Sequence, residues 1–379
     1  MALLEALTDK LSNSIAQLAP ITLSVPTSPI FQVSRFLHHV TTTPVHPVYV
    51  PYLRFGVIHA ARVTTVWAGL TKGRKNGKKV GLLQDLFGYL TMAWGGSTVV
   101  SLLLNQPPTW LSSPTPWIIY PSVYLLLIPT GLSNYIISTC PTTLFNIFGA
   151  LVDGMTRATT ITSLVTLIGS SSPFINAANG DVNLWTYALL SALAITSGGL
   201  FVGLFGLGED EWKMGVPGLL KGGLLGTLDA WGASLIGLLW LALTRQSSSL
   251  APFSEFLHIA LPSDIHSTAA LGTKPASTEP QPIHTQHTTV IDTAHARAIC
   301  AILLGGLLAT RAIILSLRSG RSQRSIAASG PQLSKKTELF VVDEKGVRES
   351  VLKSPVSAKA TRTENAKVTP RKSPRAKGK

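Results

Sequence analysis

Charged side chains are scarce in this chain of 379 residues. Asp, Glu, Lys and Arg together make up 13% of it, whereas hydrophobic residues make up 45%. A soluble domain carries about 25% charged residues, so the deficit indicates that much of the chain lies in a membrane. The sequence therefore predicts an all-α membrane protein rather than an ordinary soluble domain.

Cysteine is nearly absent as well. Only Cys140 and Cys300 occur, which excludes a disulfide framework. The body of the chain also lacks a Ser-His-Asp arrangement, zinc-ligand spacing and a phosphate-binding loop. We therefore expect no enzyme, no catalytic residue, no bound metal and no resident cofactor.

The basic excess of the chain is concentrated at its end. Residues 318–379 contain sixteen Lys or Arg but only five Asp or Glu, while the whole chain has a net charge of +14. We expect this segment to be a disordered basic tail, and we expect no nucleic-acid binding by the body. Ser354, Thr369 and Ser373 each precede a proline. Phosphorylation there would weaken the attraction of the tail to anionic lipid.

Apolar segments of membrane-spanning length recur along the chain. A transmembrane helix needs about 20 largely apolar residues. Seven segments meet this requirement: 48–70, 82–104, 116–138, 142–169, 184–207, 217–243 and 296–317. They predict a domain over 45–317, which follows an N-terminal segment over 1–44. Leucine and isoleucine at helical spacing over 4–18 predict a short amphipathic helix there, either on the membrane surface or against the body.

Basic residues in the connecting segments predict the orientation. The loop after the first span carries five of them: Lys72, Arg74, Lys75, Lys78 and Lys79. Basic loops stay in the cytoplasm, so we expect the N-terminus and the insert over 244–295 in the lumen. Seven spans then place the basic tail in the cytoplasm.

The first and fourth spans share the pattern Arg-x-Thr-Thr, at Arg62 and Arg157. The second and fifth spans share a glycine pair, Gly95-Gly96 and Gly198-Gly199. We interpret this order as two three-helix repeats, about 45–140 and 141–243, which an odd number of spans makes inverted. The glycines either bend their helices near an ion pathway or let neighbouring helices approach closely.

Charges inside the predicted spans are the candidate functional residues. Arginine in mid-membrane costs about 2.5–3.5 kcal/mol, so Arg62 and Arg157 either line a pathway, bind a lipid phosphate or pair with an acid. Asp153 lies one helical turn before Arg157 and is its nearest candidate partner. Arg62 has no acid in its own span, and an interhelical pair with Asp153 or Asp229 is the alternative to a lining role.

Two further polar features remain. Lys221 either reaches the membrane interface or takes part in a pore or gate, but it is too far along the helix from Asp229 for a direct pair. Five histidines lie in or next to the insert: His258, His266, His284, His287 and His295. Metal binding or pH sensing by them is the less favoured interpretation, because their spacing is irregular.

Three segments resemble the trimeric intracellular cation channel (TRIC) family. "AWGGSTVVSLLLNQPPTWL" at 93–111 is similar to its second helix, "YLLLIPTGLSNYI" at 124–136 to its third, with Pro129 central, and "GALVDGMTRATTI" at 149–161 to its fourth. Animal members have Lys-Glu-Val-x-Arg on the fourth helix, of which this chain keeps only the arginine, Arg157. The neutral pair Thr130-Gly131 replaces the acidic residue after the proline.

The resemblance implies a homotrimer in the endoplasmic reticulum or nuclear membrane, with one cation pathway in each subunit. Membrane lipids would be its other partners, a phosphoinositide among them. We therefore expect a potassium channel that supplies counter-ion current during calcium movement. The alternatives are a non-conducting scaffold that binds partners or lipids, and a small-solute transporter on an inverted-repeat plan. A scaffold would seal the arginines into ion pairs, and a transporter would show a closed, substrate-sized polar cavity at the midplane.

Overall fold

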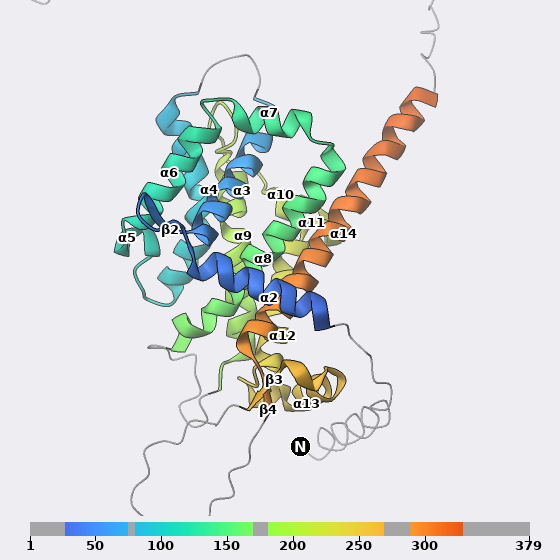
Figure 1. Cartoon of the computed structure of the whole chain (residues 1–379). Helices are drawn as coiled ribbons and strands as arrows, with labels where there is room; N and C mark the ends of the chain where they lie inside the picture. The colour runs from blue at the N-terminus through green and yellow to red at the C-terminus, as the bar shows by residue number, and fades with distance from the viewer. Residues whose placement is uncertain (1–26, 75–79, 170–180, 269–288, 329–379) are drawn as a thin grey trace, which may run out of the picture. The chain divides into compact units, whose positions relative to one another are not determined.

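The computed structural model describes residues 27–74, 80–169, 181–268 and 289–328, and helices make up most of them (Figure 1). The chain divides into two units, Met1–Arg321 and Ser322–Lys379, of which the first contains all the predicted spans. Several predictions lie outside the described residues: the helix over 4–18, the basic tail beyond 328, Lys75, Lys78, Lys79, His284, His287, Ser354, Thr369 and Ser373.

The first predicted repeat forms four main helices. These are α3 (Arg54–Thr71), α4 (Leu82–Leu103), α6 (Thr115–Leu127) and α7 (Leu132–Thr139), with the single turn α5 (Thr109–Ser112) before α6. The predicted span 116–138 is broken, and its two halves meet at 63°. Pro129 cannot donate a backbone hydrogen bond, and Gly131 has φ of 76°, so the chain leaves the helical path between them.

The second predicted repeat has the same sequence of parts. A long helix, α8 (Thr142–Gly169), precedes α9 (Leu184–Phe205), and a broken segment follows: α10 (Gly218–Lys221), α11 (Gly223–Gly226) and α12 (Leu228–Leu243). The prediction of one span over 217–243 was therefore wrong about its continuity. Gly223 has φ of 57°, a value that glycine adopts without strain, and it separates α10 from α11.

Three helices are long and apolar enough to cross a membrane: α4, α9 and residues 293–318 of α14 (Thr293–Ala328). The bent pair of α6 and α7 is a fourth candidate. The protein is thus a multi-pass membrane protein, while seven spans remain a prediction. The other predicted spans are α3, α8 and α12. Helix α3 contains Arg54, His59 and Arg62, and α12 has only 16 residues.

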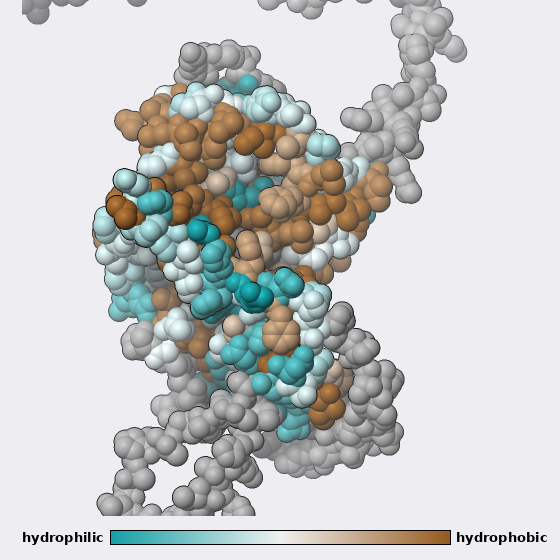
Figure 2. Space-filling view, viewed as in Figure 1, coloured by the Kyte–Doolittle hydropathy of each residue, from teal (hydrophilic) through white to brown (hydrophobic). Residues whose placement is uncertain are grey.

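Exposed apolar side chains fit this assignment. Leucines 125, 126, 144 and 303 and Phe148 are among the large hydrophobic residues left exposed on α6, α8 and α14. In Figure 2, brown surface predominates on the upper part of the visible face, and teal gathers on the lower part. Apolar side chains on the outside suit contact with lipid or with another protein chain.

Smaller elements lie around these helices. Helix α2 (Thr27–Thr42) was not predicted, although its buried residues Ile30, Leu37 and Val40 recur at helical spacing. Strands β1 (Pro44–His46) and β2 (Val50–Leu53) form one antiparallel ribbon. The insert contains η1 (Ser248–Leu250), α13 (Ala251–Ala260), η2 (Ser263–Ile265) and the ribbon of β3 (His266–Thr268) with β4 (Thr289–Ile291).

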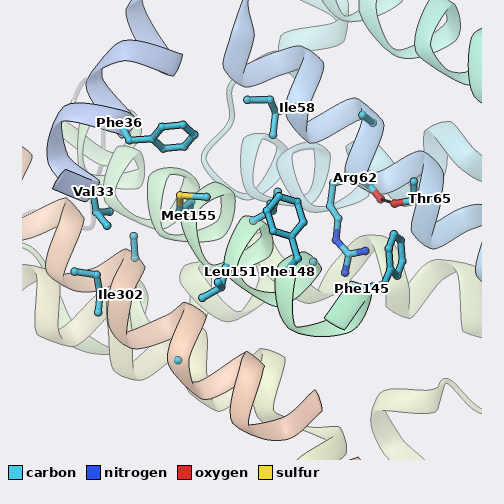
Figure 3. Close-up of a pocket in the computed structure, with 15 residues that line it drawn as sticks. Val33, Phe36, Ile58, Arg62, Thr65, Phe145, Phe148, Leu151, Met155 and Ile302 are labelled. Carbon is cyan, nitrogen blue, oxygen red and sulfur yellow. Dashed lines mark hydrogen bonds between the residues drawn. The ribbon is translucent and has the colours of Figure 1, made fainter. Parts of the chain in front are cut away.

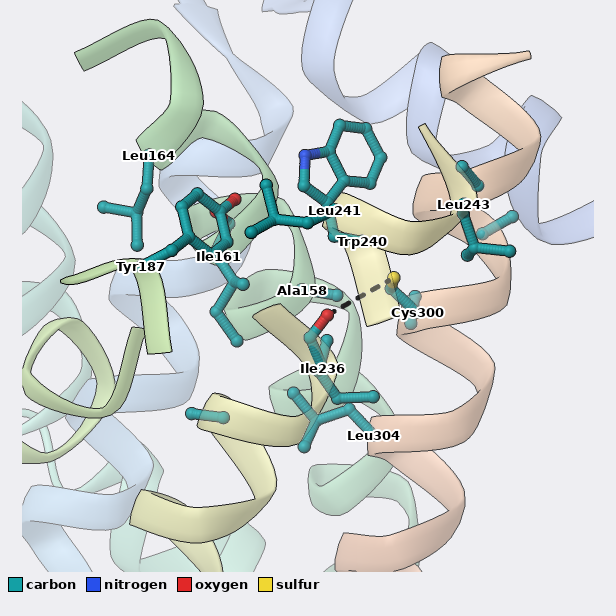
Figure 4. Packing of buried hydrophobic residues seen from close by; sticks show 14 of the residues in the cluster. Ala158, Ile161, Leu164, Tyr187, Ile236, Trp240, Leu241, Leu243, Cys300 and Leu304 are labelled. Carbon is teal, nitrogen blue, oxygen red and sulfur yellow. Dashed lines mark hydrogen bonds between the residues drawn. The ribbon is translucent and has the colours of Figure 1, made fainter. Parts of the chain in front are cut away.

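Two buried clusters hold the helices together. The larger one joins α8, α9, α12 and α14 through side chains such as Ile161, Tyr187, Leu241 and Leu304 (Figure 4). The smaller one contains Trp67, Tyr89 and Tyr124, which belong to α3, α4 and α6. These clusters set the relative positions of the helices α3, α8, α12 and α14, which carry the charged side chains described below.

Candidate ion pathway and its ion pairs

The predicted glycine pairs meet at the crossing of α4 and α9. A Cβ atom added to Gly96 would lie 1.9 Å from the carbonyl oxygen of Ala194, and one added to Gly198 would lie 2.2 Å from that of Met92. A Cβ on Gly95 would be 2.8 Å from the Cα of Gly198. Both helices run unbroken through these positions. Gly95, Gly96 and Gly198 therefore lie at a close contact between the two backbones, as one of the two interpretations of these glycines expects.

Gly199 differs from the other three glycines. No atom lies within 4 Å of the place that its Cβ would occupy. Together with Gly96 and Gly198, it borders a cavity of about 700 Å³. Side chains from α3, α4, α8, α9 and α12 line this cavity, among them four of the predicted charged residues: Arg62, Asp153, Arg157 and Asp229. Of the five charged residues that the sequence singled out within predicted spans, only Lys221 is absent from its lining.

Arg62 forms a two-pronged ion pair with Asp153. Its Nε donates to Oδ1 at 2.9 Å and its Nη2 to Oδ2 at 2.7 Å. Both side chains are 18% exposed. The pair joins α3 to α8, and its parallel geometry is the one in which arginine and carboxylate bind most strongly. It is one of the two interhelical partners that the sequence left open for Arg62.

Asp229 is shared by two arginines. Its Oδ1 accepts from Nη1 of Arg157, and its Oδ2 accepts from Nη1 of Arg311 at 2.9 Å. The local pair between Asp153 and Arg157, one of the alternatives that the sequence left open, does not form in the structure. Asp153 uses both of its oxygens for Arg62, and Arg157 reaches α12 instead. This second cluster links α8, α12 and α14 and contains one more positive charge than negative.

A second polar cavity, of about 510 Å³, lies against the same ion pair. Arg62 and Asp153 line it together with Asn146, Arg311 and Ser316. Because Arg62 and Asp153 also line the 700 Å³ cavity, the ion pair borders both spaces. In this conformation the two carboxylates and three arginines form two separate groups of ion pairs beside these cavities.

A glycine makes room for the Arg62 side chain. A Cβ on Gly149 would lie 2.8 Å from the Cζ of Arg62 and 2.9 Å from each of its Nη atoms. Both residues also line a third cavity, of about 780 Å³, between α2, α3, α8 and α14 (Figure 3). Its other side chains are almost all apolar, including Phe36, Phe148 and Ile302.

Threonine hydroxyls add acceptor oxygens to the 700 Å³ cavity. Thr156, Thr160 and Thr196 each donate their proton to a backbone carbonyl of their own helix, at 3.0, 3.1 and 2.8 Å, and all three border the cavity. A hydroxyl that has donated its proton keeps only lone pairs for other partners. These three hydroxyls therefore offer the cavity acceptor oxygens rather than donors.

Sequence reasoning missed three residues of this region. Arg311 lies in a predicted span, and the cost of a buried arginine was the signal that could have marked it. His59, whose Nδ1 lies 2.6 Å from the Tyr120 hydroxyl, was not singled out as a candidate. Gly149 gave no signal at all, because a glycine's role here depends on which side chain another helix brings to it.

Three predicted residues lie elsewhere. Lys221 is exposed on the short helix α10, and Pro129 lies at the break between α6 and α7. Arg74 is not a free basic residue of its loop: it donates to Oδ1 of Asp85 at 2.5 Å and to the carbonyl of Gly208 at 2.9 Å. Asp85 also accepts from the indole of Trp67 at 3.1 Å and from the Tyr124 hydroxyl.

Comparisons with known proteins find similarity to a solved structure, but not to a sequence family. No family model matches the sequence, and no curated protein matches it. A solved structure described as the crystal structure of a prokaryotic TRIC channel in 0.5 M KCl is similar, with a TM-score of 0.35 and 16% sequence identity. The match covers 61% of this chain and 93% of that chain. TRIC is also the family that the sequence resembles.

Proposed function

We propose that the protein is a cation channel whose pathway is closed by the ion pair between Arg62 and Asp153. The observation that carries this proposal is that this pair borders two polar cavities, of about 700 and 510 Å³. Separation of the two side chains would join the cavities. It would also free the Asp153 carboxylate, which together with the threonine oxygens offers a cation partners in place of its water.

The finer features of the proposal rest on the sequence. Potassium as the permeant ion, a homotrimer and an endoplasmic reticulum or nuclear membrane location all come from the resemblance to TRIC channels. The order of a charged helix, a glycine-pair helix and a broken helix occurs twice, which supports seven spans built as two inverted repeats. The N-terminus would then be lumenal and the tail cytoplasmic.

A scaffold is the second candidate, and the ion pairs themselves favour it. Arg62, Arg157 and Arg311 are all paired with carboxylates, as expected for charges whose role is to hold helices together in lipid. The size of the larger cavity also suits a small solute. A scaffold would conduct no ions, and a transporter would move a solute without a continuous ion current.

Single-channel recording of the purified full chain in planar bilayers tests the proposal. With a potassium chloride gradient, we expect unitary currents that reverse near the potassium equilibrium potential. In Arg62→Gln the Asp153 carboxylate loses its partner, so we expect a higher open probability. Lys213→Ala, in an exposed pair with Glu211, is the matched control for loss of a positive charge.

Three outcomes would overturn the channel. Currents that reverse at the chloride potential would make the pathway anionic. Folded protein that stays silent in both the native chain and Arg62→Gln would support the scaffold. Saturable solute uptake into liposomes without unitary currents would support a transporter.

A further inference from the structure

A separate polar cavity lies outside the predicted spans, between the end of α12 and strand β3. Its volume is about 610 Å³, and its lining includes Arg245, Glu255, His258 and His266. Arg245 follows α12, His258 and Glu255 belong to α13, and His266 is the first residue of β3. The rings of the two histidines are 5.1 Å apart.

Several nitrogen atoms of this cavity are buried without a hydrogen-bond partner among the described residues. They are both ring nitrogens of His258, Nε2 of His266 and Nε of Arg245. The Leu243 backbone lies near enough to His258 to raise its pKa, but the contact does not have the geometry of a hydrogen bond. His258 is only 8% exposed. Buried polar groups in proteins are nearly always hydrogen-bonded, so each exception needs an explanation. Four such atoms from three residues around one cavity point to a ligand that accepts hydrogen bonds.

The charges around the cavity also favour an acceptor. Burial, together with Arg245 and His266, lowers the pKa of His258 to about 4. Burial and Arg245 lower the pKa of His266 as well, although Asp264 acts in the opposite direction. Arg245 therefore supplies the positive charge at neutral pH. Glu255, the carboxylate in the lining, belongs to an exposed residue, where solvent weakens its repulsion.

We propose that this cavity binds a phosphate-type anion, which Arg245 holds with its guanidinium and His258 and His266 hold with their imidazole N–H groups. A guanidinium presents paired donors that match phosphate oxygens. A metal ion fits less well. The described residues contain no group of three or more His, Cys, Asp or Glu side chains placed to hold one, and Arg245 would repel it.

Helix α13 indicates where such a phosphate could come from. It buries Ser254 and His258 and exposes Phe253 and Ile259, which are 44% and 61% exposed. The exposed side of α13 also carries Glu255, but its large apolar side chains suit contact with the surface of a bilayer. A phospholipid headgroup and free phosphate share the chemistry that the cavity recognises, and the experiment separates these two sources.

Binding to the purified full chain in detergent is the direct test, and it requires no channel activity. Calorimetric titrations with inorganic phosphate and with sulfate, against chloride at equal ionic strength, should show a specific site for both. Arg245→Gln and His258→Gln should lose it. Glu255→Gln should bind more tightly because a repulsive charge is gone, a gain that a folding defect cannot mimic. His38→Gln, on the exposed side of α2, is the matched control.

Acid should strengthen the binding of sulfate, whose own charge is constant in this range. A bound anion favours the charged imidazole, and each unit by which it raises the pKa of His258 strengthens binding about tenfold at low pH. Because the pKa of His258 is about 4 without an anion, the gain appears only near that pH, and we expect sulfate to bind several-fold more tightly at pH 4 than at pH 7.5. Without a bound anion, acid is expected to lower the stability of the folded protein. The unfolded chain takes up the proton near pH 6.5 and the folded chain near pH 4, so stability falls on acidification between these values.

The source is decided in lipid nanodiscs. If phosphatidic acid in a phosphatidylcholine disc abolishes sulfate binding, the site takes a lipid headgroup; if it leaves sulfate binding unchanged, the ligand is a soluble anion. Phosphate and sulfate that bind no more tightly than chloride would overturn the proposal. So would zinc that raises the melting temperature of the native chain but not of His258→Gln, since the cavity would then be a metal site.

Discussion

Two groups of helices in this protein are joined in opposite ways. Helices α4 and α9 meet through glycines, with backbone against backbone and no charged side chain at the contact. Helices α3, α8, α12 and α14 are joined through two aspartates and three arginines. Small residues allow close approach in lipid, whereas charges there need partners. The first contact depends on the absence of side chains, and the second contact depends on the pairing of charges.

The largest effect is expected where one carboxylate serves two arginines. Asp229→Asn leaves Arg157 and Arg311 uncompensated, and removal of one partner from a buried ion pair costs about 3–5 kcal/mol. Asp153→Asn strands only Arg62 and should lower the melting temperature less. The measurement is thermal stability in detergent, followed by size-exclusion chromatography.

Arg311→Gln in the Asp229→Asn background supplies the control, since it removes one of the stranded charges and should recover part of the stability. If Asp229→Asn and Asp153→Asn lower the melting temperature equally, the additional arginine paired with Asp229 does not contribute to stability.

The glycine contact should give the next largest effect. Gly96→Ala places a methyl group 1.9 Å from the carbonyl oxygen of Ala194, which only a shift of α4 against α9 can relieve. Overpacking of this kind costs about 1–3 kcal/mol. Gly199→Ala, one position past Gly198 and with open space around its Cβ, is the matched control and should keep the native melting temperature. If both variants melt alike, close backbone contact does not hold this crossing.

A smaller effect is expected at Gly149, where the added methyl group meets the movable end of a side chain. Gly149→Ala should displace the guanidinium of Arg62 and weaken its pair with Asp153 by about 1 kcal/mol, a typical coupling energy between contacting residues. Under the proposed function it should also raise the open probability. In an Arg62→Ala background Gly149→Ala should have no effect. If it has the same effect there, the added methyl group acts on α8 itself and not through Arg62.

The smallest effect is expected for an ion pair outside the predicted spans. Lys213 lies 2.7 Å from Glu211, with side chains 77% and 70% exposed. The pair lowers the pKa of Glu211 and raises that of Lys213, but exposed pairs add little to stability. Glu211→Gln should leave the melting temperature unchanged from pH 5 to pH 8. A clear loss would mean that this loop contacts something beyond the chain itself.

The sequence predicted helices better than it predicted contacts. The bounds of α8 agree with the expected 142–169, and α4 ends one residue before the expected position, because continuous apolar runs mark such helices. The breaks at Pro129 and at Gly222–Gly223 lie within equally apolar runs, so hydropathy could not show them. Helix α2 was missed because it is too polar to resemble a span.

The pairing of charges depended on information that local spacing does not contain. Asp153 and Arg157 lie one turn apart, and a favourable local pair was the natural inference. In the fold, α3 brings Arg62 to Asp153, and α12 brings Asp229 to Arg157. The packing of the whole core decides which helices meet. Arg157 therefore pairs with an aspartate of another helix and not with the aspartate one turn away on its own helix. Arg311 was within reach of sequence reasoning, because any arginine in a span needs a partner.

The glycine crossing has a mechanical consequence. Where two backbones touch directly, no side chain remains that could lengthen, shorten or change its rotamer to absorb a displacement. Such a contact keeps the distance between α4 and α9 constant, so that the two helices can rotate about the crossing point but cannot move closer together. Movement that separates Arg62 from Asp153 then has to come from α3 or α8, while the distance between α4 and α9 stays the same.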